Sequence, residues 1–230
     1  AQRMQEAGVN VVYGVKGLKI HSKLTLIKKK NNKKIAAIST GNFHEGNAAV
    51  YTDFTLFTAN QQIATEVERV FEFINQPFQN QRFTHLLTSP QEMRKKLTNL
   101  VQNEILNAKK GLPAYIHCKI NHITDIRLIQ KLYEAARAGV KIRLIVRGMC
   151  SMIPDQEKLN GNIEIISIVD KYLEHSRIFI FCNNEVEKYY ISSADWMTRN
   201  LDHRIEAAVP IYSRTIQQEL RKIFDYGWMD

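Results

Sequence analysis

Two histidines stand in the same local sequence at two places in the chain. His21-Ser22-Lys23 and His175-Ser176-Arg177 each place a histidine and a serine before a base, and an apolar run and an asparagine turn follow both. Imidazole has an unperturbed pKa of about 6.5, so it can act as a nucleophile or carry a proton near neutral pH. Two such groups across a pocket can divide the work of phosphoryl transfer, one attacking phosphorus and the other assisting the leaving group.

The similarity between the two histidine segments extends upstream. AGVNVVYGVKG from Ala7 aligns with AGVKIRLIVRG from Ala138, which places Lys16 at the position of Arg147. Phosphoryl transfer depends mostly on alignment and on positive charge near the transferring oxygens. The paired cations of the repeat are therefore candidate phosphate ligands: Lys16, Lys23, Arg147 and Arg177.

The similarity also extends downstream. The corner Ser39-Thr40-Gly41-Asn42 aligns with Ser192-Ser193-Ala194-Asp195, and an apolar strand and an amphipathic helix follow in each copy. A repeat of this length predicts a duplicated structural unit. The remaining histidines lack this context and are interpreted as structural: His44, His85, His117, His122 and His203.

Each copy also carries one carboxylate in a mostly apolar strand. Asp53 and Glu206 stand six residues after Asn47 and Asn200. A buried carboxylate needs a partner, and a reactive histidine needs one ring nitrogen fixed. We therefore predict pairs within each copy, Asp53 with His21 and Glu206 with His175, at about 2.6–3.2 Å. The alternative is an ion pair with a nearby cation, such as Arg204 for Glu206.

The elements expected around these residues alternate between strands and helices. Strands are expected at 9–15, 19–28, 34–40, 51–58, 114–119, 140–146, 163–169 and 204–212, with a second hairpin over 175–192. Helices are expected at 61–74, from Ser89-Pro90 to residue 108, at 125–138 and at 215–224. This order predicts an α/β fold of two units, each a mixed sheet flanked by helices.

The polar segment 76–82 is the best internal boundary, so we expect one unit over residues 1–78 and a second over 79–230. Only residues 1–7 remain of the helix that precedes the first copy, so we expect the chain to be a fragment of a longer protein. Three cysteines without metal spacing indicate free thiols in a reducing compartment. No apolar run is long enough for a membrane span.

The formal charge of +9 favours an anionic partner. Lysines 28–30, 33 and 34 flank the Asn31-Asn32 turn, where a solvated hairpin tip is the simpler interpretation. No zinc finger, helix-turn-helix or RNA-binding aromatic motif is present, so nucleic acid is not the partner we expect. The charge is consistent with a polyanion or with phosphate groups.

The pattern of His-x-Lys/Arg, hairpin and small-residue corner resembles the phospholipase D superfamily. That family's motif adds an aspartate near the positions that Lys28 and Asn183 occupy here, and this departure counts against a phosphodiesterase. Five stretches resemble the C-terminal half of the type 1 bacterial polyphosphate kinases: GLKIHSKLTLI, STGNFHEGNAAVYTDFTLFT, AGVKIRLIVRGMCS, IVDKYLEHSRIFIF and SSADWMTRNLDHRIE. This second resemblance covers essentially the whole chain.

The resemblance implies two phospholipase-D-like units that move the γ-phosphate of ATP reversibly onto inorganic polyphosphate. It implies that His21 becomes a phosphohistidine and that Tyr51, Arg147 and His175 bind nucleotide or phosphate. Further candidate ligands for these groups are Lys16, Lys23, Arg177, Asn42 and Arg204. Magnesium is expected as a cofactor, with its ligands outside this fragment and none within it.

The resemblance also implies a homo-oligomeric parent protein in the cytoplasm, either free or associated with a membrane, and a fragment that is not fully active alone. Two other functions remain open at this point. One is a phospholipase-D-type phosphodiesterase or nuclease, and the other is a non-catalytic module that binds polyanions. The absent motif aspartates count against the first, and the paired histidines count against the second.

Overall fold

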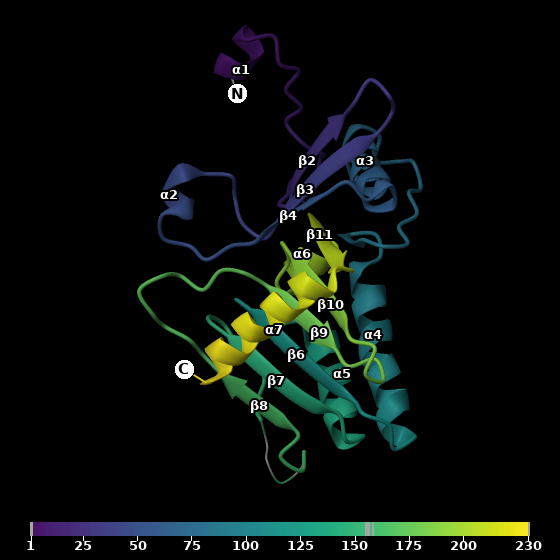
Figure 1. Ribbon diagram of the computed structural model, residues 1–230, viewed down its shortest axis with the longest axis vertical. Coiled ribbons are helices and arrows are strands. Elements are labelled where there is room, and N and C mark those ends of the chain that lie inside the picture. Colours follow the sequence, from purple (N-terminus) through teal and green to yellow (C-terminus); the bar gives the residue numbers. More distant parts are fainter. Residues whose placement is uncertain (1, 155–156, 158, 230) are drawn as a thin grey trace.

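The computed structural model describes residues 2–154, 157 and 159–229, and within them the chain forms one large mixed sheet and one small antiparallel sheet (Figure 1). The large sheet contains β1 (Lys19–Ile20), β5 (Leu87–Ser89), β6 (Tyr115–Ile120), β7 (Lys141–Val146), β8 (Ile163–Ile166), β9 (Ile178–Phe181), β10 (Lys188–Ser192) and β11 (Arg204–Ile211). Its order is β1-β11-β10-β9-β6-β7-β8, with β5 also paired to β11. The small sheet contains β2 (Lys23–Lys28), β3 (Lys34–Ser39) and β4 (Thr55–Thr58).

The helices are α1 (Gln2–Glu6), α2 (Glu45–Ala48), α3 (Gln61–Asn75), α4 (Met93–Lys109), α5 (Ile126–Arg137), α6 (Thr198–Asp202) and α7 (Arg214–Met229). α4 and α5 cover one face of the large sheet, and α7 covers the other. Figure 1 shows α7 lying across one face of the large sheet, whereas α3 packs beside the small sheet. Among the described residues, none of these helices combines the length and the apolar composition that a membrane span requires.

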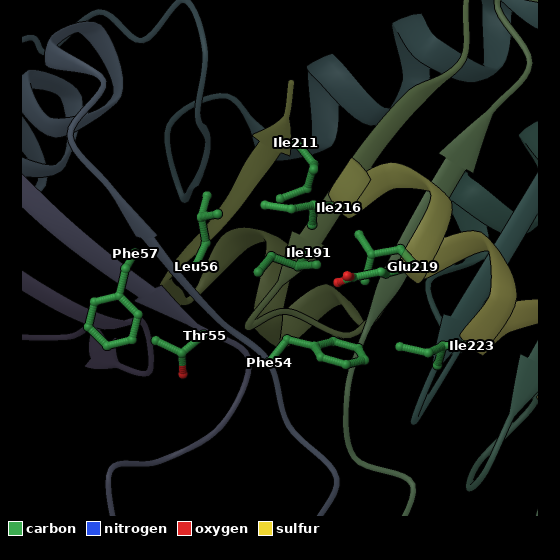
Figure 2. A pocket seen from close by; sticks show the side chains of 10 residues that line it. Phe54, Thr55, Leu56, Phe57, Ile191, Ile211, Ile216, Glu219 and Ile223 are labelled. Carbon is green, nitrogen blue, oxygen red and sulfur yellow. The ribbon is translucent and has the colours of Figure 1, made fainter. Parts of the chain in front are cut away.

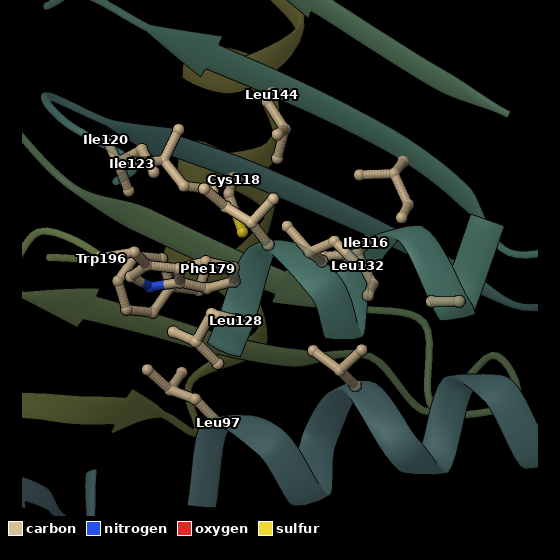
Figure 3. Close-up of a cluster of buried hydrophobic side chains, with 14 of the residues drawn as sticks. Leu97, Ile116, Cys118, Ile120, Ile123, Leu128, Leu132, Leu144, Phe179 and Trp196 are labelled. Atoms are coloured by element: carbon tan, nitrogen blue, oxygen red, sulfur yellow. The ribbon is translucent and has the colours of Figure 1, made fainter. Parts of the chain in front are cut away.

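Alternation along the central strands builds two separate cores. Phe179 and Phe181 of β9 point toward α4 and α5, where they join the cluster that includes Leu97 and Leu128 (Figure 3). The intervening residues of the same strand, including Ile180, point to the other face and pack in a cluster with α3 and α7. Both faces of the central strands are therefore buried, and the sheet is a rigid support for the residues at its strand ends.

The expected α/β class is confirmed, as are the helices with clear periodicity. The helix expected at 61–74 is α3, and the Asn60 side chain caps it by accepting from the backbone N–H groups of residues 62 and 63. The first hairpin turns at Asn32 with φ 60°, and the second turns through Asn183 and Asn184 with φ 47° and 54°. Asparagine tolerates this left-handed backbone, which explains why both hairpins turn where the sequence predicts.

Three expectations about the elements are wrong. Residues 9–15 form no strand, and Val12 and Tyr13 are 50% and 78% exposed, because no neighbouring strand offers them hydrogen bonds. Ser89 ends β5 instead of capping a helix, and α4 begins only at Met93. The first unit is not built on a mixed sheet of its own, since its small sheet is antiparallel and β1 joins the large sheet. The division at residue 78 stays a prediction.

Candidate active site

The backbone brings each motif histidine beside the other copy's carboxylate strand. β1 runs parallel to β11, with Lys19 opposite Arg204, and the N–H of His21 donates to the carbonyl of Ile205 at 2.9 Å. In the other half, Tyr51 forms a parallel bridge with Leu173, two residues before the second histidine. In both pairings, the residue two positions before the histidine of one copy lies opposite the residue two positions before the carboxylate of the other copy. The two copies are therefore joined near their histidines by the same backbone pairing, which occurs twice.

The histidine–carboxylate pairs are therefore exchanged between the copies. Nδ1 of His21 lies 2.8 Å from Oε1 and 2.9 Å from Oε2 of Glu206. Nδ1 of His175 lies 2.8 Å from Oδ1 and 3.0 Å from Oδ2 of Asp53. The prediction that each histidine is held by a carboxylate was right, but the predicted pairing within each copy is wrong. The reason is that β11, which carries Glu206, pairs with the segment leading to His21, and Tyr51, two residues before Asp53, pairs with the segment leading to His175.

Hydroxyl groups of the two small-residue corners hold these carboxylates. Ser193 donates its hydroxyl to Glu206, and Thr40 at the equivalent position donates to Asp53 at 2.6 Å. Asn200 Nδ2 adds a third contact to Glu206 at 2.7 Å. The repeat alone does not assign these corners a role, and the signal for it is the hydroxyl group that each carries at the equivalent position, Ser193 and Thr40.

Gly41 is required by the close approach of Asp53. A Cβ atom at this position would lie 1.8 Å from Asp53 Oδ2, which is far inside any van der Waals contact. Burial raises the pKa of Asp53, but the hydrogen bonds from His175 and Thr40 outweigh it and bring the net pKa below its usual value. Asp53 is therefore an anion that accepts a hydrogen bond from Nδ1–H of His175.

The same arrangement leaves the other ring nitrogen of each histidine free. Nε2 of His21 and Nε2 of His175 make no hydrogen bond within the described part of the chain. The side chains of His21 and His175 are 24% and 16% exposed. A carboxylate on Nδ1–H fixes the tautomer whose Nε2 carries a lone pair, which is the form that attacks an electrophile.

The cations of the two motifs have different surroundings. Arg177 is buried and pairs with Asp195 through Nε at 2.9 Å and Nη2 at 3.1 Å, and its Nη1 also donates to the carbonyl of Thr40. Lys23 is also buried but donates to the carbonyl of His21 and makes no ion pair among the described residues. Burial lowers the pKa of Lys23 to about 8, a shift that Arg177 and Arg204 reinforce and that Glu206 and Asp53 oppose.

Of the other predicted ligands, some lie near the paired histidines and others are exposed to solvent. The ring of Tyr51 lies 5.1 Å from the ring of His175, and Arg147 is half-buried with its Nε 2.9 Å from Asn121 Oδ1. Lys16 and Asn42 are exposed, and the strand that was expected to deliver Lys16 is absent. The alternative ion pair between Arg204 and Glu206 does not occur within the described residues. Arg204 contributes instead to the positive field around Lys23.

Three of the histidines outside the repeated motifs have local partners, as expected for structural residues. His117 stacks on Phe224 at 5.0 Å between ring centroids, and burial lowers its pKa to about 3. His122 accepts from the N–H of Met149 at 2.9 Å, and His85 contacts the hydroxyl of Tyr212 at 2.6 Å. Each ring is therefore engaged by local packing or hydrogen bonds.

An apolar pocket of about 260 Å³ lies between β4 and α7 (Figure 2). Phe54, Leu56, Ile191 and Ile223 line it, and Glu219 is the one carboxylate among its lining residues. None of the paired histidines, carboxylates or cations lines this pocket. Within the described residues, no group of three or more histidine, cysteine or acidic side chains gathers as a metal site requires.

Family models match nearly all of the chain. Residues 1–80 match the model for polyphosphate kinase C-terminal domain 1, and residues 86–230 match the model for polyphosphate kinase C-terminal domain 2. The polyphosphate kinase of Escherichia coli K12 is 48% identical over all of this chain and 34% of its own length. That of Vibrio cholerae is 48% identical over 99% of this chain and 33% of its own length. The chain thus spans about a third of these relatives.

Solved structures agree with the sequence comparison. The polyphosphate kinase of Porphyromonas gingivalis is 41% identical and superposes with a TM-score of 0.93, covering 100% of this chain and 36% of that one. Yeast tyrosyl-DNA phosphodiesterase is only 9% identical, with a TM-score of 0.54 over 83% of this chain and 66% of its own. This second likeness shows a shared fold.

Proposed function

The chain belongs to the polyphosphate kinase family, and from this premise we propose that its full-length protein transfers the γ-phosphate of ATP reversibly to inorganic polyphosphate. The observation that carries the proposal is the His21–Glu206 pair, in which a fully buried carboxylate holds Nδ1 and leaves Nε2 unbonded within the described residues. This geometry suits a nitrogen nucleophile.

In the first step, Nε2 of His21 attacks the γ-phosphorus of ATP, the bond from that phosphorus to the bridging oxygen breaks, and ADP leaves. The product is a phosphohistidine whose positive ring is stabilised by Glu206. In the second step, a terminal oxygen of polyphosphate attacks the same phosphorus and regenerates His21. The reverse sequence makes ATP from ADP. The first step breaks a phosphorus–oxygen bond and forms a phosphorus–nitrogen bond, and the second step breaks that phosphorus–nitrogen bond and forms a new phosphorus–oxygen bond.

His175 has the matching role of proton carrier or phosphate ligand. Asp53 holds its Nδ1, so Nε2 can donate to or accept from the leaving oxygen. Tyr51, whose ring lies beside His175, fits a nucleotide contact, and Arg147 fits a contact to the phosphate chain. Lys23 supplies a positive charge that no carboxylate among the described residues contacts directly.

Magnesium is the cofactor that the family implies, and the described residues of this chain do not fit a site for it. Asp53 and Glu206 bond to imidazole and hydroxyl groups, and no cluster of carboxylates remains. We therefore propose that the ion is held by the substrate phosphates and by residues outside this chain. A cytoplasmic or membrane-associated homo-oligomer remains our proposal for the full-length protein.

The test is phosphorylation of the full-length protein with ATP labelled at the γ-phosphate. Wild-type protein is expected to acquire label that is lost in acid and kept in base, as a phosphoramidate requires, and to pass it to polyphosphate. His21→Ala is expected to take none. His85→Ala, which alters a half-buried histidine outside the repeated motifs, is the matched control and is expected to label normally. Label retained by His21→Ala would contradict the assignment.

A further inference from the structure

Asn121 lies immediately after β6, between the end of β7 and the segment that leads into β9, three strands that lie side by side in Figure 1. The residue is 1% exposed. A buried amide side chain has both donors and an acceptor to satisfy, so its neighbours reveal what it holds in place. None of the motifs in the sequence includes Asn121.

The hydrogen bonds of Asn121 reach three parts of the site. Its Oδ1 accepts from Nε of Arg147 at 2.9 Å, and its Nδ2 donates to the backbone carbonyl of His175 at 3.2 Å. Its backbone N–H donates to Oδ1 of Asp195 at 2.9 Å, and its carbonyl accepts from the N–H of Gly148 at 2.7 Å. One residue thus joins the guanidinium, the second histidine and the carboxylate that neutralises Arg177.

We propose that Asn121 is a positioning residue that holds Arg147 and His175 in a fixed relation, so that both reach the phosphates of the nucleotide together. The proposal rests on the function proposed above. It assigns Asn121 no contact with substrate.

The chemical type of Asn121 matters because an amide can orient a cation without cancelling its charge. Within the described residues, Arg147 makes no ion pair, and Asn121 supplies its only side-chain acceptor. Arg177 shows the contrast, because Asp195 orients it and also neutralises it. A guanidinium held by a neutral oxygen keeps its full charge and its Nη donors for a phosphate.

Asn162 provides a matched control. It is also a buried asparagine, 7% exposed, and its Nδ2 donates to the carbonyl of Ala136 at 2.8 Å. Asn162→Ala therefore removes the same kind of side-chain bond to a backbone carbonyl, but at a place that touches neither Arg147 nor His175. Its effect on thermal stability measures the structural part of the loss.

The experiment is a double-mutant cycle in the full-length protein, with kcat/KM for ATP, ATP affinity by calorimetry and Tm as readouts. Asn121→Ala is expected to lower kcat/KM by about 10–100-fold, as expected for a misplaced catalytic group. In an Arg147→Ala background the same change is expected to cost clearly less than in the wild type, because one of the two groups that Asn121 holds is gone and only its bond to the carbonyl of His175 remains to be lost. Asn162→Ala is expected to lower Tm similarly and to leave kcat/KM within about twofold.

Asn121→Asp gives a second test that preserves shape. It keeps an acceptor for Arg147 but adds a negative charge and loses the donor to the carbonyl of His175, so ATP affinity is expected to fall about tenfold or more. This variant carries the test if the alanine variant does not fold. Equal losses from Asn121→Ala in both backgrounds, or unchanged affinity in Asn121→Asp, would overturn the proposal. A wild-type protein that transfers no phosphate would instead contradict the proposed function, while ATP affinity would still report on Asn121.

Discussion

The two copies of the repeat hold their histidines alike and their cations differently. In the second copy, Asp195 binds Arg177 through two hydrogen bonds, and the pair is buried. In the first copy, the position equivalent to Asp195 is Asn42, which is exposed, and Lys23 has no carboxylate in direct contact among the described residues. The guanidinium of the second copy is thus neutralised by its own carboxylate, whereas no carboxylate among the described residues directly neutralises the ammonium of the first copy.

This difference shows how a duplicated unit can diverge without losing its symmetric core. The exchanged histidine–carboxylate pairs need both copies, so neither copy can lose its carboxylate without affecting the other's histidine. The flanking cations are not exchanged in this way, since Arg177 pairs with the carboxylate of its own copy. Glu206 is fully buried with three partners, whereas the Asp53 side chain is 20% exposed, so the pair that includes His21 is the more tightly held.

The largest expected effect tests whether the two pairs are equivalent. Glu206→Gln is expected to lower kcat about 10³–10⁴-fold, because an amide N–H would face Nδ1 of His21 and drive the proton to Nε2. Asp53→Asn, acting through His175, is expected to cost about 10²-fold, the lower end of what general acid–base catalysis contributes. Steady-state kinetics of the full-length protein with ATP and polyphosphate measure both changes.

Glu104→Gln is the control for this prediction. Glu104 is a fully buried carboxyl group on α4, and burial raises its pKa to about 7, so the amide resembles a form that it already adopts. Its variant is expected to keep kcat within about twofold. If Glu206→Gln retained more than a tenth of the wild-type kcat, the carboxylate would not set the tautomer of His21.

A smaller effect tests the free cation of the first copy. Because the pKa of Lys23 is lowered to about 8, the side chain is charged below that pH and loses its charge above it. kcat/KM for ATP, which reports groups of the free enzyme, is therefore expected to fall up to about tenfold per pH unit above pH 8. Lys23→Arg keeps its charge at every accessible pH, so this descending limb is expected to disappear.

Lys96→Arg is the matched control for the pH profile, since Lys96 donates to the backbone carbonyl of Leu86 at a distance from the site. Its profile is expected to match the wild type. A descending limb that persisted in Lys23→Arg would assign the pH dependence to another group.

The smallest expected effect is at Lys16, which is compared with Arg147 because the two cations occupy equivalent positions in the repeat. Lys16 is exposed in a turn, so Lys16→Ala is expected to change kcat/KM for ATP by less than about twofold. Arg147→Ala is expected to lower it about 10–100-fold, since a held guanidinium stabilises charge on the transferring phosphate. Equal losses of kcat/KM in Lys16→Ala and Arg147→Ala, assayed side by side, would contradict this prediction. They would mean that the two cations act equivalently although residues 9–15 form no strand.

Local patterns predicted the elements that depend on local physics. The apolar face of α3, the helix α5 and the asparagine turns of both hairpins follow from periodicity and backbone tolerance. The run at 9–15 carries an equally clear strand pattern, yet Val12 stays half exposed. A strand forms only where a neighbouring strand shares its backbone hydrogen bonds, and the residues of the run do not indicate whether such a strand lies beside it.

The sequence by itself determined the chemistry of the site: a histidine, a cation, a hydroxyl corner and a carboxylate in each copy, in the same order twice. The tertiary structure decided which carboxylate serves which histidine. His21 and Glu206 are 185 residues apart along the chain, and His175 and Asp53 are 122 apart. Such contacts are set by the parallel alignment of β1 with β11 and of Tyr51 with Leu173. The spacing of residues within one copy does not predict this alignment, because packing over the whole sheet determines which strands pair.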